Sequence, residues 1–277
     1  MTTPLIQTPL ASRHRTLSRS GLAIGLLLAT AATAQEYRAP RTADDRPDLN
    51  GIWQALGSAH WDVEGHAARM GPVVATGALG AIPAGLGVVD GGEIPYQPWA
   101  AEKQAANLAD WLKLDPAVKC YLPGVPRATY MPFPFQIVQT PDAILLTYEF
   151  AGASRTVYMN RPDFESPADM WMGHSRGHWE GETLVVDVTS QVADTWLDSS
   201  GNFHSDKLRV VERYTATSPH HLLYEVTLED PDVFTRPWKM SMPVYRRLEK
   251  DAKIHEVQCV EFAEPFMYGS VSLPPLK

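Results

Sequence analysis

The sequence predicts a mainly β protein, an antiparallel barrel or sandwich of roughly eight to ten strands. Several segments alternate apolar residues with a period of two, which places those residues on one face of a strand. Short turn-forming sequences separate these segments, and one segment alone has a convincing helical period. The alternating sets are Ile144, Leu146, Tyr148 and Phe150; Leu184, Val186 and Val188; and Leu222, Tyr224, Val226 and Leu228.

The first 34 residues have the pattern of a secretory signal peptide. Three arginines precede an apolar run over residues 22–32, and Ala32-Thr33-Ala34 fits the small-x-small cleavage pattern. The apolar run is about half of the ~20 residues that a membrane-spanning helix needs, and no later segment approaches that length. We therefore expect residues 35–277 to form a single mainly β domain that is exported, periplasmic or secreted, and has no membrane span.

The charge of the chain argues against a nucleic-acid partner. The formal net charge is −8, and removal of residues 1–34 takes away three arginines and no acidic residue, which leaves −11. Such a surface repels a polyanion. The partner that we expect is a small molecule.

The chain has two cysteines, Cys120 and Cys259. Because disulfides persist outside the cytosol, export favours their pairing. Two unlinked buried thiols are the alternative, since sequence spacing does not establish that two residues are close in space. A pair would close a long loop and stabilise the fold by roughly 3–5 kcal/mol.

An irregular insertion and a helix are expected between the first strand and the others. Residues 70–92 are rich in Gly, Ala, Pro and Val and contain seven glycines, so we expect an irregular insertion over residues 70–97, either a lid or a flexible tether. Residues 98–114 are the expected helix, and Pro98 suits its first turn. Its apolar residues recur at three- and four-residue steps: Ala101, Ala105, Leu108 and Leu112.

Two resemblances support a barrel. Gly51-Ile52-Trp53, on the expected first strand, is similar to the Gly-x-Trp signature of lipocalins and the wider calycin group. Most of the chain also resembles a large group of exported bacterial proteins of unassigned function. Together these resemblances imply a lipocalin-like β-barrel, but no activity. The segments that carry the second resemblance are PDLNGIW, KCYLPGVPR, PFQIVQTPD, WMGHSRGHWEGETLVVD, TWLDSSGNFHSDKLRVVERY and EVTLEDPDVFTRPW.

Polar residues that suit chemistry concentrate in residues 171–189 and 195–205. In the group that the chain resembles, an arginine usually precedes the Trp-Glu-Gly turn, whereas this chain has His178 there. The resemblance therefore supports His174 as a site residue and leaves the part of His178 open. The polar residues of the two stretches are His174, His178, Asp187, Asp198 and His204.

Neither a metal site nor a serine nucleophile is expected in these stretches. A helix would place His174 and His178 on one side, but Gly173 and Gly177 disfavour a helix there, and an extended chain does not bring the two imidazoles together tightly. No Gly-x-Ser-x-Gly elbow is present. We therefore expect no metal and no cofactor.

One carboxylate is expected on an apolar strand face. Glu212 shares a face with Val210 and Tyr214, and a buried carboxylate must be paired or used. Arg155, Arg213 or a histidine would pair with it. Beside an imidazole, Glu212 would suit general acid–base chemistry. The alternative is a structural ion pair that supports the barrel.

The leading hypothesis is an exported, metal-independent enzyme that isomerises, eliminates from or hydrates a small hydrophobic or aromatic molecule. Aromatic residues near the polar stretches would line its cavity. The alternatives are a lipocalin-like carrier without chemistry and a hydrolase with paired carboxylates among Asp187, Asp198 and Glu212. The candidate catalytic residues are His174, His204, Asp198 and Glu212, and the candidate substrate-binding residues are Trp171, Arg155, Tyr148, Tyr158, Trp196, Arg213 and His178.

Overall fold

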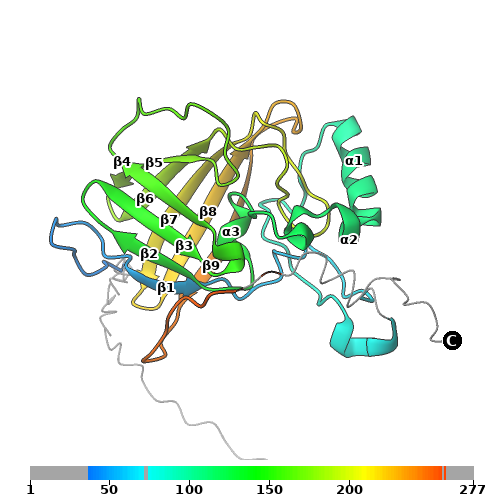
Figure 1. Cartoon of the computed structure of the whole chain (residues 1–277), viewed down its shortest axis with the longest axis horizontal. Helices are drawn as coiled ribbons and strands as arrows, with labels where there is room; N and C mark the ends of the chain where they lie inside the picture. The colour runs from blue at the N-terminus through cyan, green and yellow to red at the C-terminus, as the bar shows by residue number, and fades with distance from the viewer. Residues whose placement is uncertain (1–36, 72–73, 258, 260–277) are drawn as a thin grey trace, which may run out of the picture. The chain divides into compact units, whose positions relative to one another are not determined.

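The computed structural model describes residues 37–71, 74–257 and 259. The predicted signal peptide, residues 1–34, lies outside the described residues. Within the described part, nine strands pair in the order of the sequence and the last pairs with the first, so the sheet closes into a barrel (Figure 1). The predicted mainly β barrel is therefore confirmed. The strands are β1 (Gly51–Gln54), β2 (Phe135–Gln139), β3 (Ala143–Tyr148), β4 (Ser154–Met159), β5 (His174–Glu180), β6 (Thr183–Thr189), β7 (Arg209–Ser218), β8 (His221–Glu229) and β9 (Trp238–Arg246).

The barrel is mixed rather than purely antiparallel, because β4 and β5 run parallel. Val157 lies opposite Ser175, and Met159 lies opposite Gly177. A tight turn joins only antiparallel strands, so the chain must return to the same end of the barrel through a long connection, here residues 160–173. A side chain at Gly177 would come within 2.6 Å of a Val157 methyl, which explains the glycine at this seam.

Strand residues alternate between the barrel interior and its outer surface. The sets with a period of two point inward as predicted, from β3 with Ile144 and Tyr148 to β8 with Leu222 and Leu228. Phe150, expected on the β3 face, instead begins a 3₁₀ turn. A one-residue shift would exchange the two faces of a strand, so burial of one face fixes the register.

The Gly-x-Trp segment lies where the barrel closes. Trp53 is buried on β1 and faces Arg246 of β9, whose guanidinium carbon lies 4.1 Å from the centre of a Trp53 ring. Arg246 also donates to the carbonyl of Asn50 (2.6 Å). Gly51 has φ of 142°, and a Cβ there would collide with the guanidinium. Glycine and tryptophan at these positions therefore allow one arginine to join the two ends of the sheet.

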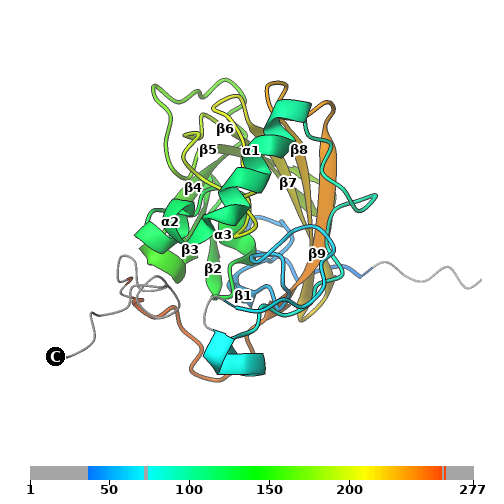
Figure 2. The ribbon, with the colours of Figure 1, turned by 90° about the vertical axis from the view of Figure 1, so that its right-hand side faces the viewer.

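Short helices lie outside the barrel (Figures 1 and 2). The helical period over residues 98–114 is interrupted at Asp110, where ψ is 32°. The expected apolar residues Ala101 and Ala105 are exposed, and the helix instead buries its Ala100 and Asn107 side. The helices are α1 (Pro98–Ala109), α2 (Trp111–Leu114) and α3 (Arg127–Tyr130), with 3₁₀ turns η1 (Val74–Gly80), η2 (Pro116–Lys119) and η3 (Phe150–Gly152). No helix among the described residues is long and apolar enough to cross a membrane.

Part of the expected irregular insertion is held against β9. The short β1 pairs only with Tyr245 and Arg246, which leaves the rest of this β9 edge for another partner. Ser241 donates its amide to the Val88 carbonyl (3.0 Å), and Asp90 donates to the Lys239 carbonyl (2.9 Å). Covering an open strand edge protects it from pairing with other chains.

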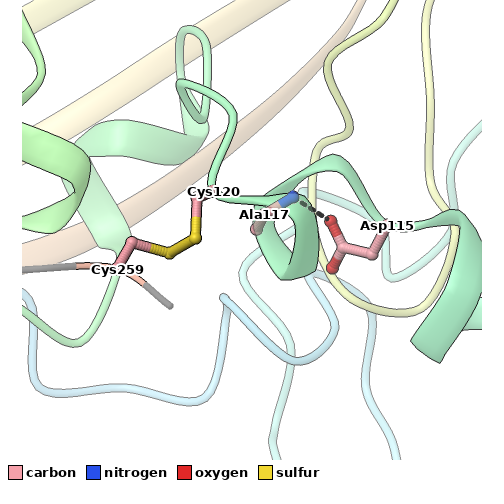
Figure 3. Close-up of a disulfide and its surroundings, with 4 residues drawn as sticks. All are labelled: Asp115, Ala117, Cys120 and Cys259. Atoms are coloured by element: carbon pink, nitrogen blue, oxygen red, sulfur yellow. Dashed lines mark hydrogen bonds between the residues drawn. A yellow bond between two sulfur atoms is a disulfide. The ribbon is translucent and has the colours of Figure 1, made fainter. Parts of the chain in front are cut away.

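The predicted disulfide between Cys120 and Cys259 is confirmed (Figure 3). Cys120 follows η2, whose first turn is capped by Asp115 accepting from the amide of Ala117 (2.9 Å). The two cysteines are 139 residues apart, so the bond closes a long loop in the unfolded chain. A loop of this length corresponds to about 5 kcal/mol in the chain-entropy account.

Candidate functional site

The interior of the barrel contains a buried ion pair. Arg155 on β4 and Glu212 on β7 form two parallel hydrogen bonds, of 2.6 and 2.8 Å, and both side chains are almost completely buried. Three phenols surround the pair: Tyr148 accepts from Arg155 Nε (3.0 Å), and Tyr214 and Tyr224 donate to Glu212 Oε1 (2.9 and 2.7 Å). Of the partners considered for Glu212, Arg155 is the one that the fold supplies.

This network leaves no free donor on the arginine. The five N–H bonds of Arg155 go to Glu212, twice, and to Tyr148, Tyr214 and Ser175. Burial opposes the charge of Arg155, but the Glu212 carboxylate raises its pKa well above the usual value. Burial raises the pKa of Tyr148, Tyr214 and Tyr224, so these phenols remain protonated. A saturated network of this kind rigidifies a core and offers little to a ligand.

A pocket of about 550 Å³ lies at the parallel seam. β4 and β5 begin at the same end of the barrel, and Ser154, Thr156 and Tyr158 alternate with the buried Arg155 and Val157. They therefore face outward, on the side covered by the connection between the two strands. The lining residues are Leu122, Ser154, Arg155, Thr156, Tyr158, Asp169, Met170, Trp171, Met172, Gly173, His174 and Ser175. Four of the predicted site residues thus meet here: His174, Trp171, Tyr158 and Arg155.

His174 is the imidazole of this pocket. It pairs with Thr189 across the β5–β6 ladder, on the outward side, yet it is only 4% exposed because the connection covers it. Its Nε2 lies 2.7 Å from the carbonyl oxygen of Phe164. A carbonyl accepts only, so Nε2 carries the proton. Nδ1 has no hydrogen-bond partner among the described residues and is not one of their fully buried unpartnered atoms, so we take it as the nitrogen left for a bound molecule.

Aromatic rings hold this imidazole and extend the pocket wall. Tyr158 stacks on His174 with ring centres 5.5 Å apart and an angle of 27°, and Phe164 meets His174 edge-on at 5.1 Å. Trp171 contacts Tyr121 at 5.0 Å. Tyr121 follows Cys120 directly, so the disulfide anchors the chain next to the pocket.

His204 lies in the β6–β7 connection and has no free nitrogen. Its Nδ1 donates to the carbonyl of Ser205 (2.8 Å), and its Nε2 accepts from Thr195 Oγ1 (2.7 Å) and from the amide of Gln191 (3.1 Å). Burial lowers the pKa of His204, which favours the neutral ring. None of these bonds reaches His174, so the two candidate catalytic histidines share no hydrogen bond.

Asp198 organises the same connection. It accepts the backbone amides of Val63 (2.9 Å) and Ser200 (2.9 Å), and the amide group of Asn202 (2.6 Å). Burial, and next the carboxylate of Asp62, raises the pKa of Asp198 to about 7, against these donors. The adjoining Ser200 carbonyl accepts from Gln104 of α1 (2.6 Å), so this connection is the surface on which the helix docks.

The remaining predicted residues lie apart from the pocket. Asp187 and Arg213 point outward, to Arg209 (3.0 Å) and Glu180 (2.8 Å) respectively, and the exposed His178 lies 3.2 Å from Glu180. Trp196 is buried in the β6–β7 connection, opposite Phe203.

The three carboxylates that the hydrolase hypothesis requires do not converge, because each has partners of its own. Glu212 lies inside the barrel, Asp187 lies on its outer surface, and Asp198 lies in a connection. Among the described residues, no group of three or more His, Cys, Asp and Glu side chains is placed to hold a metal ion.

Sequence reasoning missed part of the pocket wall. Met170 and Met172 flank Trp171, and Leu122 follows the disulfide. Phe164 fixes the proton on His174 through its carbonyl, a role that no side-chain motif reveals. The available signal was the cluster of methionines and tryptophan immediately before β5.

Comparisons with known proteins add little to this description. No protein-family model matches the chain. No curated protein matches it. Among solved structures, a crystal structure of a mutant of the fluorescent protein UnaG is similar over 52% of this chain and 89% of that chain, with 17% identity and a TM-score of 0.28. At this score the similarity carries no argument, and the barrel is established by the strand pairing alone.

Proposed function

We propose that this protein binds a small, largely aromatic molecule in the pocket at the β4–β5 seam, as an exported binding or carrier protein. The observation that carries the proposal is the composition of the pocket: aromatic and methionine walls around one imidazole with an unused nitrogen. Small-molecule sites typically combine an apolar lining with a few polar groups that fix orientation. The confirmed disulfide supports a location outside the cytosol.

The interior network supports placing the ligand at the seam rather than inside the barrel. A ligand at the level of Arg155 and Glu212 would have to displace five satisfied donors and two buried charges. Removing one partner of a buried pair costs about 3–5 kcal/mol, which a small ligand would have to offset. The seam pocket requires no such rearrangement.

The test is retention of a molecule from a pool of apolar metabolites by the folded protein, read by mass spectrometry after dialysis. Trp171→Ala removes the largest side chain that lines the pocket, so it should abolish retention of the molecule. Trp99→Ala is the matched control, since Trp99 lies exposed on α1 and does not line the pocket. Equal retention by wild type and Trp171→Ala would place the ligand elsewhere and contradict the proposal.

A second candidate function is acid–base catalysis at the same pocket. The observation that favours it is the fixed tautomer of His174: with Nε2 held by Phe164, Nδ1 is a lone-pair acceptor that suits proton abstraction. Isomerisation, elimination and hydration can each be catalysed by such a base. A product peak from the metabolite pool with wild type, absent with His174→Ala, would establish an enzyme. Enrichment of unchanged molecules alone would favour the carrier.

A further inference from the structure

We infer that the pocket selects aromatic molecules that present a neutral O–H or N–H donor to Nδ1 of His174, with phenols as the best-matched class. This inference rests on the proposed binding function and specifies the ligand chemistry. Its starting point is the Phe164 carbonyl at 2.7 Å from Nε2, which fixes the proton on that nitrogen. In a neutral imidazole the other nitrogen then accepts.

The orientation of the His174 ring, and with it the direction in which Nδ1 accepts, is also fixed. Tyr158 covers one face of the imidazole at 5.5 Å, and Phe164 closes its edge at 5.1 Å. The ring therefore cannot turn without breaking its hydrogen bond and its aromatic contacts together. A preorganised acceptor of this kind favours a ligand whose donor lies in a matching position.

The charged residues that line the pocket do not favour an anionic ligand. Arg155, the arginine among the lining residues, has all five N–H bonds committed to the interior network. The remaining charged lining residue is Asp169, which repels a carboxylate. A neutral donor group therefore fits the site better than an acid of the same size.

A molecule without a donor would lose affinity for a physical reason. It would displace water from Nδ1 and leave that acceptor without a hydrogen-bond partner, which is unfavourable. Sites that hydrogen-bond a ligand hydroxyl therefore reject analogues that lack the hydroxyl more strongly than sites that distinguish ligands by size.

The experiment compares three probes of one shape: a naphthol, its methyl ether and the corresponding naphthoic acid, each titrated into the full disulfide-bonded protein by calorimetry. We expect wild type to bind the naphthol at least about tenfold more tightly than the ether, the value of one hydrogen bond, and more tightly than the acid. His174→Phe keeps the ring and its stacking but removes the acceptor, so it should bind naphthol and ether about equally.

Two further variants keep the test decisive. His174→Gln retains an acceptor oxygen and should preserve the preference for the naphthol over the ether. This variant still tests the inference if His174→Phe does not fold. His220→Phe, in the exposed turn between β7 and β8, is the control and should leave the preference unchanged.

The possible results distinguish a failure of the inferred selectivity from a failure of the proposed binding function. Equal binding of naphthol and ether by wild type, or tightest binding of the acid, overturns the inferred selectivity and leaves the binding function standing. Binding of none of the three probes overturns the proposed function and the inference with it.

Discussion

His174 and His204 are both buried histidines, the sequence predicts both to be catalytic, and their surroundings differ in one decisive respect. His204 uses both ring nitrogens on partners within the protein, Ser205 on one side and Thr195 with Gln191 on the other. His174 uses one nitrogen on Phe164 and lines a pocket with the other available. Burial therefore does not distinguish the two histidines, whereas unused hydrogen-bonding capacity does. This difference is the basis on which we propose His174, and not His204, as a ligand-binding residue.

The same criterion sorts the other polar groups. Arg155 and Glu212 form the most buried charged pair of the described barrel interior and have no capacity left. Asp198 is likewise committed to backbone and amide donors. We therefore expect substitutions at these residues to affect stability and those around His174 to affect binding.

The largest effect is expected for Glu212→Gln. The substitution leaves the Arg155 charge buried without its carboxylate, and breaking a buried pair costs about 3–5 kcal/mol. Urea unfolding should show this loss, while ligand affinity of the remaining folded protein stays unchanged. A folded Glu212→Gln protein of wild-type stability that no longer binds would assign Glu212 to the site and break the comparison.

Removal of the disulfide should come next. Cys120→Ser combined with Cys259→Ser should lower the free energy of unfolding by about 2–5 kcal/mol, a range whose upper end is the chain-entropy value. Because Tyr121 contacts Trp171, the double variant should also bind the pocket ligand more weakly. Denaturant unfolding and calorimetric titration measure the two effects, and unchanged affinity would show that the disulfide does not position the pocket wall.

Asp198→Asn tests the structural assignment of the β6–β7 connection. Its amide nitrogen would face donors, so we expect a loss of about 1–3 kcal/mol with no change in ligand affinity. Ligand affinity reduced tenfold at unchanged stability would contradict the assignment.

The pH dependence of stability provides a second test of Asp198. Its folded pKa of about 7 lies above the ordinary value of 3.8, so the folded state binds this proton more tightly than the unfolded state. The contribution to stability is therefore complete below pH ~4 and is lost as the pH rises to ~7. His60, whose pKa burial lowers to about 4, contributes the opposite slope, because its stabilisation is lost as the pH falls from ~6.5 to ~4.

Comparing wild type with Asp198→Asn isolates the contribution of the aspartate, because His60 is present in both proteins. The gap between their free energies of unfolding should narrow as the pH rises from ~4 to ~7. A gap independent of pH would contradict the raised pKa.

The smallest effect on stability is expected for His174→Ala. It removes one hydrogen bond, about 1 kcal/mol, and the ring contacts with Tyr158 and Phe164 on a pocket wall. His204→Ala leaves the buried Thr195 and Gln191 groups unpaired and should cost more, about 1–3 kcal/mol. Binding should respond in the reverse order, with a large loss for His174→Ala and none for His204→Ala. Melting curves and titrations of the two variants check both orders.

The strands were predictable because a period of two is a local property of the sequence. The inward position of Glu212 followed from its neighbours Val210 and Tyr214, and burial of that face made the register unambiguous. Gly51-Ile52-Trp53 marked the first strand by its residue types, and the structure explains these types by the contact with Arg246.

The site was less predictable, because it depends on which strands become neighbours. A parallel pairing of β4 with β5 brings Tyr158 beside His174, and no local pattern encodes that pairing. The exposed face of α1 was misread for a related reason. The side-chain amides of Gln104 and Asn107 donate to backbone carbonyls of the β6–β7 connection and so attach the helix to it. Such hydrogen bonds cannot be predicted from the spacing of apolar residues.

The most direct test of the account is the position of the bound molecule. A crystal structure of the protein with the molecule that it retains from the metabolite pool would locate it. We predict a ligand at the β4–β5 seam that contacts Trp171 and hydrogen-bonds Nδ1 of His174, with the bonds between Arg155 and Glu212 intact. A ligand inside the barrel that displaces this pair, or one seated against His204 and Asp198, would contradict the central claim.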